Sequence, residues 1–197
     1  MAATQHAQQI KQDSQTYLTT ALLQLLETKD LSDITVAQVV RRAGVSRMAF
    51  YRNFDTLDDI LIAYFRPLIA ARFNDVVNQA PQNEKLSALG EFFGALTDTL
   101  NLAVKRGFEH VIQQIFDENM MHFYETTVDW QTVSTTQKKY WIKFMTAGVY
   151  AIWREWLLSG QSESLESIHE ILAKFQTATF AALSVSQTVV KSNDSCP

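Results

Sequence analysis

Apolar side chains recur at steps of three and four residues along most of this chain, and that spacing constrains the fold more than any other feature. Between Gln8 and Thr28 the recurring residues form one stripe along a helix and leave the opposite face polar. The same period predicts further helices over residues 36–43, 47–54, 56–77, 84–107, 108–127 (as one helix or two), 134–160 and 164–185. No stretch shows the sustained two-residue alternation of a half-buried β-strand. The sequence therefore predicts an all-α protein.

Positive charge is concentrated in one short segment, although the 197-residue chain is acidic overall with a net charge of −4. Residues 39–54 hold Arg41, Arg42, Arg47 and Arg52 and no carboxylate. A local cationic surface on an acidic body suits a polyanionic partner such as nucleic acid, and the acidic remainder discourages binding elsewhere.

The ends of the chain and its longest apolar run bear on localisation. The N-terminal segment lacks the apolar core of a signal peptide, and the uncharged run Phe144–Trp153 is too short to span a bilayer. We therefore expect a cytoplasmic protein with no membrane partner. Cys196, the single cysteine, stands in a polar segment where we expect neither a disulfide nor a positioned nucleophile.

Two short predicted helices joined by a glycine turn form the motif that most directly indicates a function. Thr35 is expected to cap the helix 36–43, Gly44 to end it in a left-handed conformation, and Ser46 to cap the helix 47–54. This arrangement is a helix-turn-helix, whose second helix enters the major groove of DNA. The predicted DNA contacts are Thr35, Ser46, Arg47, Met48, Ala49, Tyr51, Arg52 and Asn53. Arg47 has the reach to bond guanine O6 and N7, whereas Met48 and Ala49 suit a thymine methyl group.

The segment from Ile34 to Leu61 resembles the DNA-binding signature of the TetR/AcrR family of transcriptional regulators. The matching residues are Ile34, Thr35, Val36, Val39, Ala43, Gly44, Val45, Ser46, Phe50, Tyr51, Phe54 and Leu61. Three positions depart from the family pattern: Met48 replaces a small residue, Asn53 replaces a histidine or tyrosine, and Leu57 replaces a lysine that binds phosphate.

The resemblance implies a homodimer that binds double-stranded operator DNA and responds to a small-molecule effector of unknown identity, needing no cofactor. Repression is the expected sign of control. We expect a helix-turn-helix DNA-binding domain over residues 1–55, a helical effector-binding and dimerisation domain over 56–185, and a disordered tail over 186–197. The C-terminal body also bears a looser similarity to regulators of dihydroxyacetone kinase operons, which names no ligand.

The body carries 18 of the 22 aromatic residues, enough for a core, a cavity wall and a partner surface. The candidates for an effector cavity, each of which core packing also explains, are Phe92, Phe93, Phe108, Phe116, Phe123, Tyr124 and Trp153. The candidates for a dimer interface form a stripe that is either a dimer contact or intramolecular core: Trp141, Phe144, Met145, Gly148 and Ile152.

Catalysis finds little support, and we expect no enzyme. The sequence has no glycine-rich phosphate loop and no nucleophile elbow. Glu118 and His122 are spaced to share a helix face, but zinc usually takes at least three protein ligands, so no metal site is expected. The alternative function is a small-molecule binding or adaptor protein whose head, altered at Met48 and Leu57, no longer binds an operator.

Overall fold

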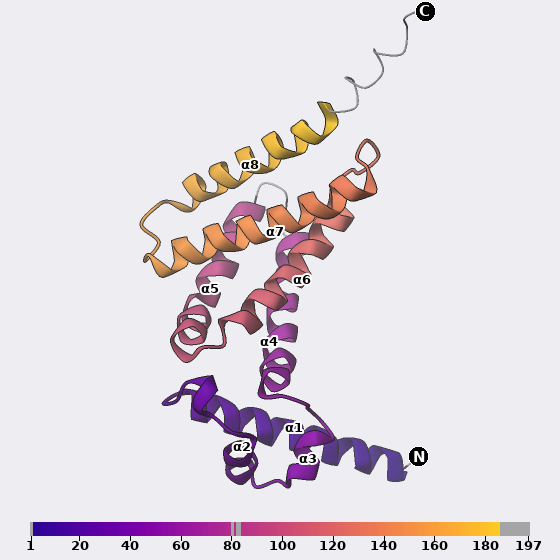
Figure 1. Cartoon of the computed structure of the whole chain (residues 1–197), viewed down its shortest axis with the longest axis vertical. Helices are drawn as coiled ribbons and strands as arrows, with labels where there is room; N and C mark the ends of the chain where they lie inside the picture. The colour runs from indigo at the N-terminus through magenta and orange to yellow at the C-terminus, as the bar shows by residue number, and fades with distance from the viewer. Residues whose placement is uncertain (1, 80, 82–83, 186–197) are drawn as a thin grey trace, which may run out of the picture. The chain divides into compact units, whose positions relative to one another are not determined.

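A computed structural model describes residues 2–79, 81 and 84–185, and it is helical throughout, with no strand in those ranges (Figure 1). The elements in chain order are α1 (Ala2–Leu26), the 3₁₀ turn η1 (Leu31–Asp33), α2 (Val36–Ala43), α3 (Arg47–Tyr51), α4 (Leu57–Asn74), the π-helical turn η2 (Asp75–Gln79), α5 (Lys85–Arg106), α6 (Glu109–Thr127), α7 (Thr135–Leu158) and α8 (Leu165–Val185). The all-α prediction is confirmed.

The chain divides into two compact units that do not follow sequence order. The first unit comprises the residues up to Arg72 together with Asp98–Ile115, and the second comprises Phe73–Thr97 together with the described residues from Phe116 onward. Helices α4, α5 and α6 therefore each contribute residues to both units. The predicted tail over 186–197 lies outside the described residues.

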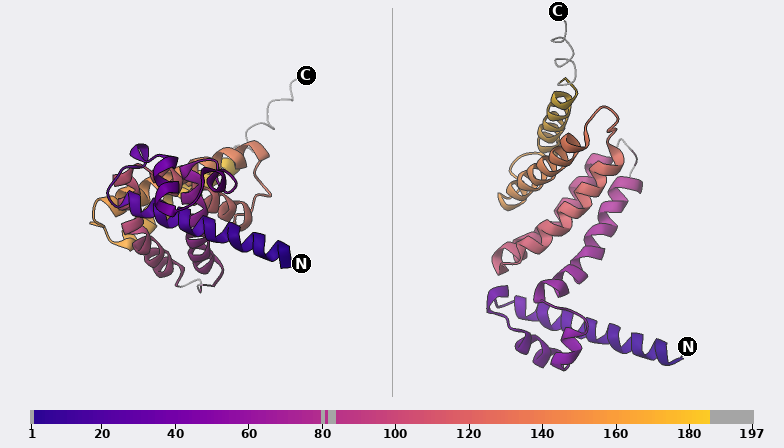
Figure 2. Two further views of the ribbon diagram at one scale, coloured as in Figure 1. Left: turned by 90° about the horizontal axis from the view of Figure 1, so that it is seen from below. Right: turned by 45° about the vertical axis from the view of Figure 1, so that its right-hand side comes forward.

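In the first unit, α1 packs against α2 and α3. The apolar stripe of α1 supplies Leu18, Leu22 and Leu26, which have no exposed surface. Burying a side chain of this size contributes roughly 1.5–3 kcal/mol of transfer free energy, so the stripe holds the two short helices in place. Figures 1 and 2 show the first turns of α1 extending past α2 and α3, and residues 7–13 there are exposed.

In the second unit, α7 and α8 lie side by side, as Figures 1 and 2 both show. Trp141 of α7 has edge contacts with Trp130 and Phe180, at centroid distances of 5.5 and 5.6 Å. Its indole N–H donates to the Thr179 hydroxyl of α8 over 3.0 Å, so the polar end of this buried ring is satisfied.

The helix boundaries largely follow the capping residues read from the sequence. Ser134 forms a capping box with Gln137 at the start of α7, and positive-φ glycines, Gly107 and Gly160, follow α5 and α7. Residues 109–127 form one helix. The expected start of α1 at Gln8 was too late, because the preceding alanines and Gln5 favour a helix without adding an apolar stripe.

Two further ends differ from the expected ones. Helix α3 stops at Tyr51, three residues earlier than expected, and α4 gives way at Asn74 to a π-helical turn. Apolar residues continue at helical spacing past both ends, so the spacing alone could not predict where these helices stop.

Candidate nucleic-acid interface and cavity

The start and end of α2 are fixed by the residues that the sequence singled out. The Thr35 hydroxyl accepts from the Gln38 N–H over 3.3 Å, and the Gln38 side chain accepts from the Thr35 N–H over 2.8 Å. Gly44 ends the helix with φ of 67°, a left-handed conformation that costs glycine little. The Val45 N–H then donates to the Val40 carbonyl over 3.1 Å, which closes the turn between the two helices.

Helix α3 begins at Ser46, whose hydroxyl accepts from the Ala49 N–H over 3.1 Å. Its outer face presents Met48, which is 83% exposed, and Tyr51, which is 59% exposed. Its inner face buries Phe50 completely. The helix is therefore held by one aromatic anchor and offers its other side to solvent.

Two of the predicted contact residues are turned toward the protein. Ala49 is 8% exposed, so its methyl group packs inside the unit. The Asn53 side-chain amide donates to the Ala49 carbonyl over 2.6 Å and so caps the end of α3. The structure thus brings Arg47, Met48, Tyr51 and Arg52 together on the exposed face, with Thr35 and Ser46 exposed at the helix starts.

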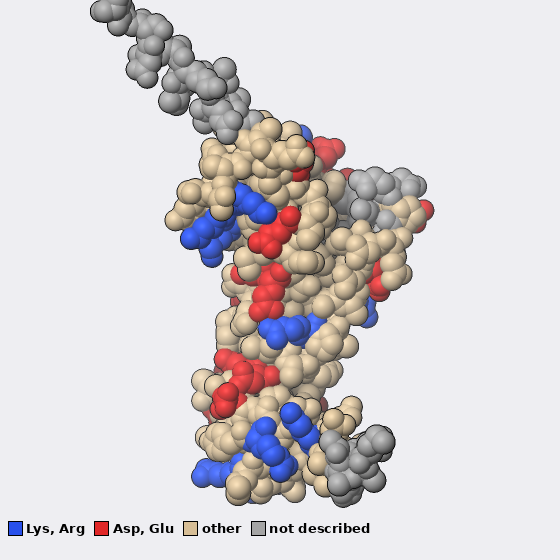
Figure 3. Space-filling view, turned by 90° about the vertical axis from the view of Figure 1, so that its right-hand side faces the viewer, with Lys and Arg blue, Asp and Glu red and all other residues tan. Residues whose placement is uncertain are grey.

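The four arginines of this region are all exposed. Arg42 donates from Nε to the Gln24 side chain of α1 over 2.8 Å. No carboxylate of the described residues forms an ion pair with Arg41, Arg47 or Arg52. In the lower part of Figure 3, where α1–α3 lie, basic side chains form blue patches on a largely uncharged surface. Such cations are available to phosphate groups.

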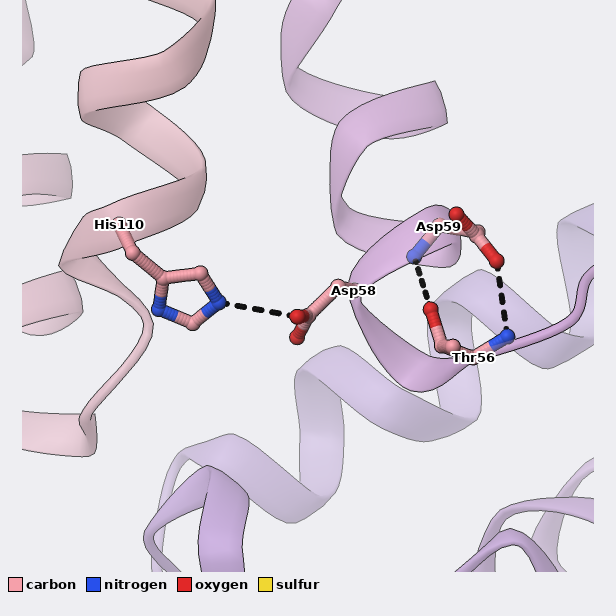
Figure 4. A network of polar contacts seen from close by, with 4 residues as sticks. All are labelled: Thr56, Asp58, Asp59 and His110. Atoms are coloured by element: carbon pink, nitrogen blue, oxygen red, sulfur yellow. Dashed lines mark hydrogen bonds and ion pairs between the residues drawn. The ribbon is translucent and has the colours of Figure 1, made fainter.

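The start of α4, which follows α3 in the chain, carries a further reciprocal cap between Thr56 and Asp59 (Figure 4). The Thr56 hydroxyl accepts from the Asp59 N–H over 3.2 Å, and the Asp59 carboxylate accepts from the Thr56 and Asp55 N–H groups over 2.8 and 3.0 Å. Partial burial alone raises the pKa of Asp59, but hydrogen bonds from Thr56 and from the backbone of Asp55 outweigh it and lower that pKa. The carboxylate therefore stays charged at the positive end of the helix dipole.

Within the first unit, the turn between α5 and α6 makes polar contacts with the N-terminal part of the chain that could not be predicted from the sequence. His110 Nε2 lies 2.9 Å from Asp58 Oδ2 (Figure 4). The Arg106 guanidinium pairs with Asp30 over 3.4 Å and donates to the Glu27 carbonyl. These partners stand 52 to 79 positions apart in the chain, so no local pattern signals them.

The second unit contains a cavity of about 540 Å³. Its walls come from the end of α4, from η2 and from α5 to α8, through Phe73, Val76, Val77, Phe93, Met120, Phe123, Thr127, Val149, Trp153, His169, Leu172, Ala173 and Gln176. Three of the predicted effector residues, Phe93, Phe123 and Trp153, are among them.

The other four predicted effector residues are placed elsewhere. Phe92 and Phe116 are buried in ring contacts with Phe93, at 5.0 and 5.9 Å, and do not line the cavity. Phe108 belongs to the first unit, where it stacks on Phe65 at 5.9 Å. Tyr124 accepts a hydrogen bond of 2.6 Å from the Gln176 amide. Burial raises the pKa of Tyr124 to about 12, although the bond from Gln176 opposes the shift, so the phenol is neutral.

The predicted dimer stripe is divided between the inside and the outside of the second unit. Trp141 and Met145 are buried, at 6% and 3% exposure, whereas Phe144 is 63% exposed. Gly148 and Ile152 are half-buried. Tyr140 of α7 and Ile171 and Phe175 of α8 are, like Phe144, large apolar side chains that are exposed.

A half-buried carboxyl group, that of Asp117, lies in the same unit. Burial raises the pKa of Asp117, and the charge of Lys143 only partly offsets the effect. Within the described ranges, no three His, Cys, Asp or Glu side chains come close enough together to hold a metal ion. Nor does any helix in those ranges combine the length and the apolar character needed to cross a membrane.

Comparison with known families gives two matches. The family model described as "Bacterial regulatory proteins, tetR family" matches residues 18–64, and the model described as "Transcriptional regulator C-terminal region" matches residues 95–178. The two segments together make up more than half of the chain. Among curated proteins, no relative with significant sequence similarity was found.

Solved structures share the fold at low sequence identity. A TetR transcriptional regulator from Streptococcus agalactiae 2603V aligns over 89% of this chain and 99% of its own, with a TM-score of 0.53 and 16% identity. A TetR transcriptional regulator from Rhodococcus sp. RHA1 aligns over 88% of this chain and 98% of its own, with a TM-score of 0.51 and 14% identity. The two family models and this shared fold show that the chain belongs to the TetR family of transcriptional regulators, which are DNA-binding proteins and not enzymes.

Proposed function

We propose that this regulator binds a near-palindromic operator as a homodimer in the cytoplasm, represses transcription there, and is controlled by a small molecule in the cavity of the second unit. The observation that carries the DNA-binding part is the outer face of α3. Arg47, Met48, Tyr51 and Arg52 are exposed on one short helix that Ser46 caps and Phe50 anchors.

The residues of this face have different roles in the proposal. Arg47 stands in the first turn of α3, where a guanidinium can donate two bonds to one guanine. Met48 is the apolar contact to a thymine methyl, and it takes that role alone because Ala49 is buried. Tyr51 and Arg52 lie further along the helix and hold the phosphate backbone, as do the hydroxyls of Thr35 and Ser46.

The exposed apolar surface of α7 and α8 supports the homodimer. Tyr140, Phe144, Ile171 and Phe175 are each between 41% and 63% exposed, which is unusual for large apolar side chains on two adjacent helices. A second copy packed on this surface forms a four-helix interface. The two helix-turn-helix domains of the dimer then bind half-sites whose centres lie about 34–36 Å apart, which is one turn of DNA.

The cavity supports the proposed control by a small molecule. An effector that binds one conformation of the dimer more tightly than the other shifts the population toward it, and DNA affinity changes by the same coupling free energy. Repression is the sign of control that we favour, by analogy with the family. An effector that releases the regulator from DNA then switches transcription on.

The test is selection of bound duplexes from a random pool, followed by titration of the best sequence with the full chain at several salt concentrations. We expect Arg47→Ala to weaken binding by about 1–3 kcal/mol and to relax the preference at one base pair. Arg72→Ala, which removes an exposed arginine outside residues 39–54, is the matched control and should leave the preference unchanged.

Two outcomes decide between this proposal and the adaptor alternative. Binding that weakens as salt rises and that is specific for one selected sequence supports the regulator. If no sequence is enriched and Arg47→Ala behaves like Arg72→Ala, the head does not read DNA and the adaptor function stands.

A further inference from the structure

The chemistry of the cavity walls restricts which molecules can occupy them. Ten of the thirteen described residues that line the cavity are apolar, and none of those thirteen is Lys, Arg, Asp or Glu. His169 is the one histidine among those thirteen residues. An ion moved from water into such a site loses its hydration and gains no fixed counter-charge, which disfavours its binding.

The nearest charges on α8 do not supply a counter-charge. Glu170 and Lys174 flank the lining residues in sequence, but they pair with each other over 3.4 Å, with side chains 69% and 75% exposed. Glu170 and Lys174 directly follow the lining residues His169 and Ala173 in sequence, so they lie on a neighbouring face of α8, and that face is directed toward solvent.

Aromatic rings give the apolar walls a fixed shape. Phe93 stacks on Trp153 with centroids 4.0 Å apart and planes 16° apart. Phe73 meets Phe123 edge to face at 6.2 Å. Rings held by each other in this way change rotamer only at a cost in packing, so the walls suit a ligand that is itself flat and apolar.

Polar groups enter the cavity mainly from α8. His169 and Gln176 stand two turns apart on one face, about 10 Å along the axis, with Leu172 and Ala173 between them. One end of the Gln176 amide is bonded to Tyr124, which fixes its orientation and leaves the other end for a ligand. From α6, the Thr127 hydroxyl donates to the Phe123 carbonyl over 2.7 Å, so its lone pairs can still accept.

We propose that the cavity takes a neutral, largely aromatic small molecule carrying a hydroxyl, carbonyl or amide group, and that the amide of Gln176 binds this polar group. The volume of about 540 Å³ is within the range of about 300–1,000 Å³ that ligand sites occupy. The inference rests on the proposed function in that the cavity is taken to be the effector site.

The experiment compares three probes of one shape by isothermal titration calorimetry on the full chain without DNA. The probes are 4-biphenylmethanol, which is neutral, biphenyl-4-carboxylate, which is anionic, and 4-biphenylmethylammonium, which is cationic. We expect the neutral alcohol to bind at least about tenfold more tightly than either ion, because only the ions lose the hydration of a charge and gain no counter-charge in return. Tighter binding of the carboxylate would overturn the proposal and assign a counter-charge to His169.

Two substitutions on α8 locate the binding. Ala173→Phe fills the cavity and should abolish binding of the alcohol, whereas Ala181→Phe, on the exposed face of the same helix, should leave it unchanged. Equal affinities of these two variants, or no binding of the alcohol to the unaltered chain, would overturn the proposal. Circular dichroism of both variants checks that each one is folded.

A third variant tests the role of Gln176 without filling the cavity. Gln176→Leu removes the hydrogen bond to the ligand. The affinity for 4-biphenylmethanol should therefore fall about three- to tenfold, whereas the affinity for unsubstituted biphenyl should not change. An equal loss for both probes would contradict the polar contact. Since these titrations contain no DNA, their failure is distinct from a failure of the operator-binding test, which uses no probe.

Discussion

Gly44 shows how one residue fixes the geometry of the candidate DNA interface. It occupies the left-handed region at φ of 67°, between two helices that together span only residues 36–51. A Cβ atom at this position would meet nothing within 4 Å. The need for glycine is therefore one of backbone conformation and not of space.

This distinction predicts opposite effects for two glycine substitutions. Gly44→Ala should destabilise the protein by about 1–2 kcal/mol, because alanine in the left-handed region brings Cβ close to the following carbonyl. Gly94→Ala, within α5 and equally unobstructed, should stabilise it by about 0.5–1 kcal/mol, because alanine loses less backbone entropy on folding. Urea denaturation of the two variants measures both signs. A loss of stability in Gly94→Ala as large as in Gly44→Ala would show that space, and not φ, decides.

At the scale of elements, the turn between α5 and α6 is part of the unit that holds the helix-turn-helix. Phe108 has no exposed surface and stacks on Phe65 of α4. Arg106 and His110 reach the residues after α1 and the first turn of α4. The exposed His110–Asp58 contact contributes little by itself, so the buried ring is the main support.

We therefore expect Phe108→Ala to lower the free energy of unfolding of the first unit by about 3–5 kcal/mol, the usual cost of removing a buried aromatic ring. Hydrogen exchange should quicken together in α1, α2, α3 and residues 98–115, because they share one core. Phe108→Leu, which keeps most of the volume, should restore much of the protection. Faster exchange confined to residues 98–115 would mean that the helix-turn-helix does not depend on this turn.

At the scale of the whole molecule, the proposed dimer depends on an apolar surface that one copy leaves exposed. Phe144 and Phe175 are 63% and 52% exposed on α7 and α8. Replacing both with glutamate places two charges on each side of the proposed interface, where like charges meet and lose hydration.

The double variant Phe144→Glu, Phe175→Glu should sediment as a monomer at micromolar concentration, whereas we expect the unaltered chain to sediment as a dimer. Its affinity for a two-half-site operator should fall toward that for a single half-site, since the heads no longer bind as a linked pair. Tyr17→Glu alters an equally exposed aromatic residue of α1 and serves as the control. A double variant that remains dimeric would place the interface elsewhere.

The sequence by itself determined which segments are helical and where the helix-turn-helix lies. Thr35, Gly44 and Ser46 act through bonds to residues at most five positions away, or through their own backbone angles. Their effect can therefore be predicted from the local sequence. The exposed face of α3 was predicted only in part, since Ala49 and Asn53 were expected on it and are turned toward the protein.

Only the tertiary structure decided which aromatic residues line the cavity and which residues support the helix-turn-helix. Phe92 and Phe93 are adjacent and equally apolar, yet only Phe93 lines the cavity. Trp141 is buried by partners from other parts of the chain, and Arg106 and Phe108 belong to a unit whose other residues come from the first 72. Helical period places a side chain on the buried side of a helix, but contacts between residues distant in sequence decide what it meets there.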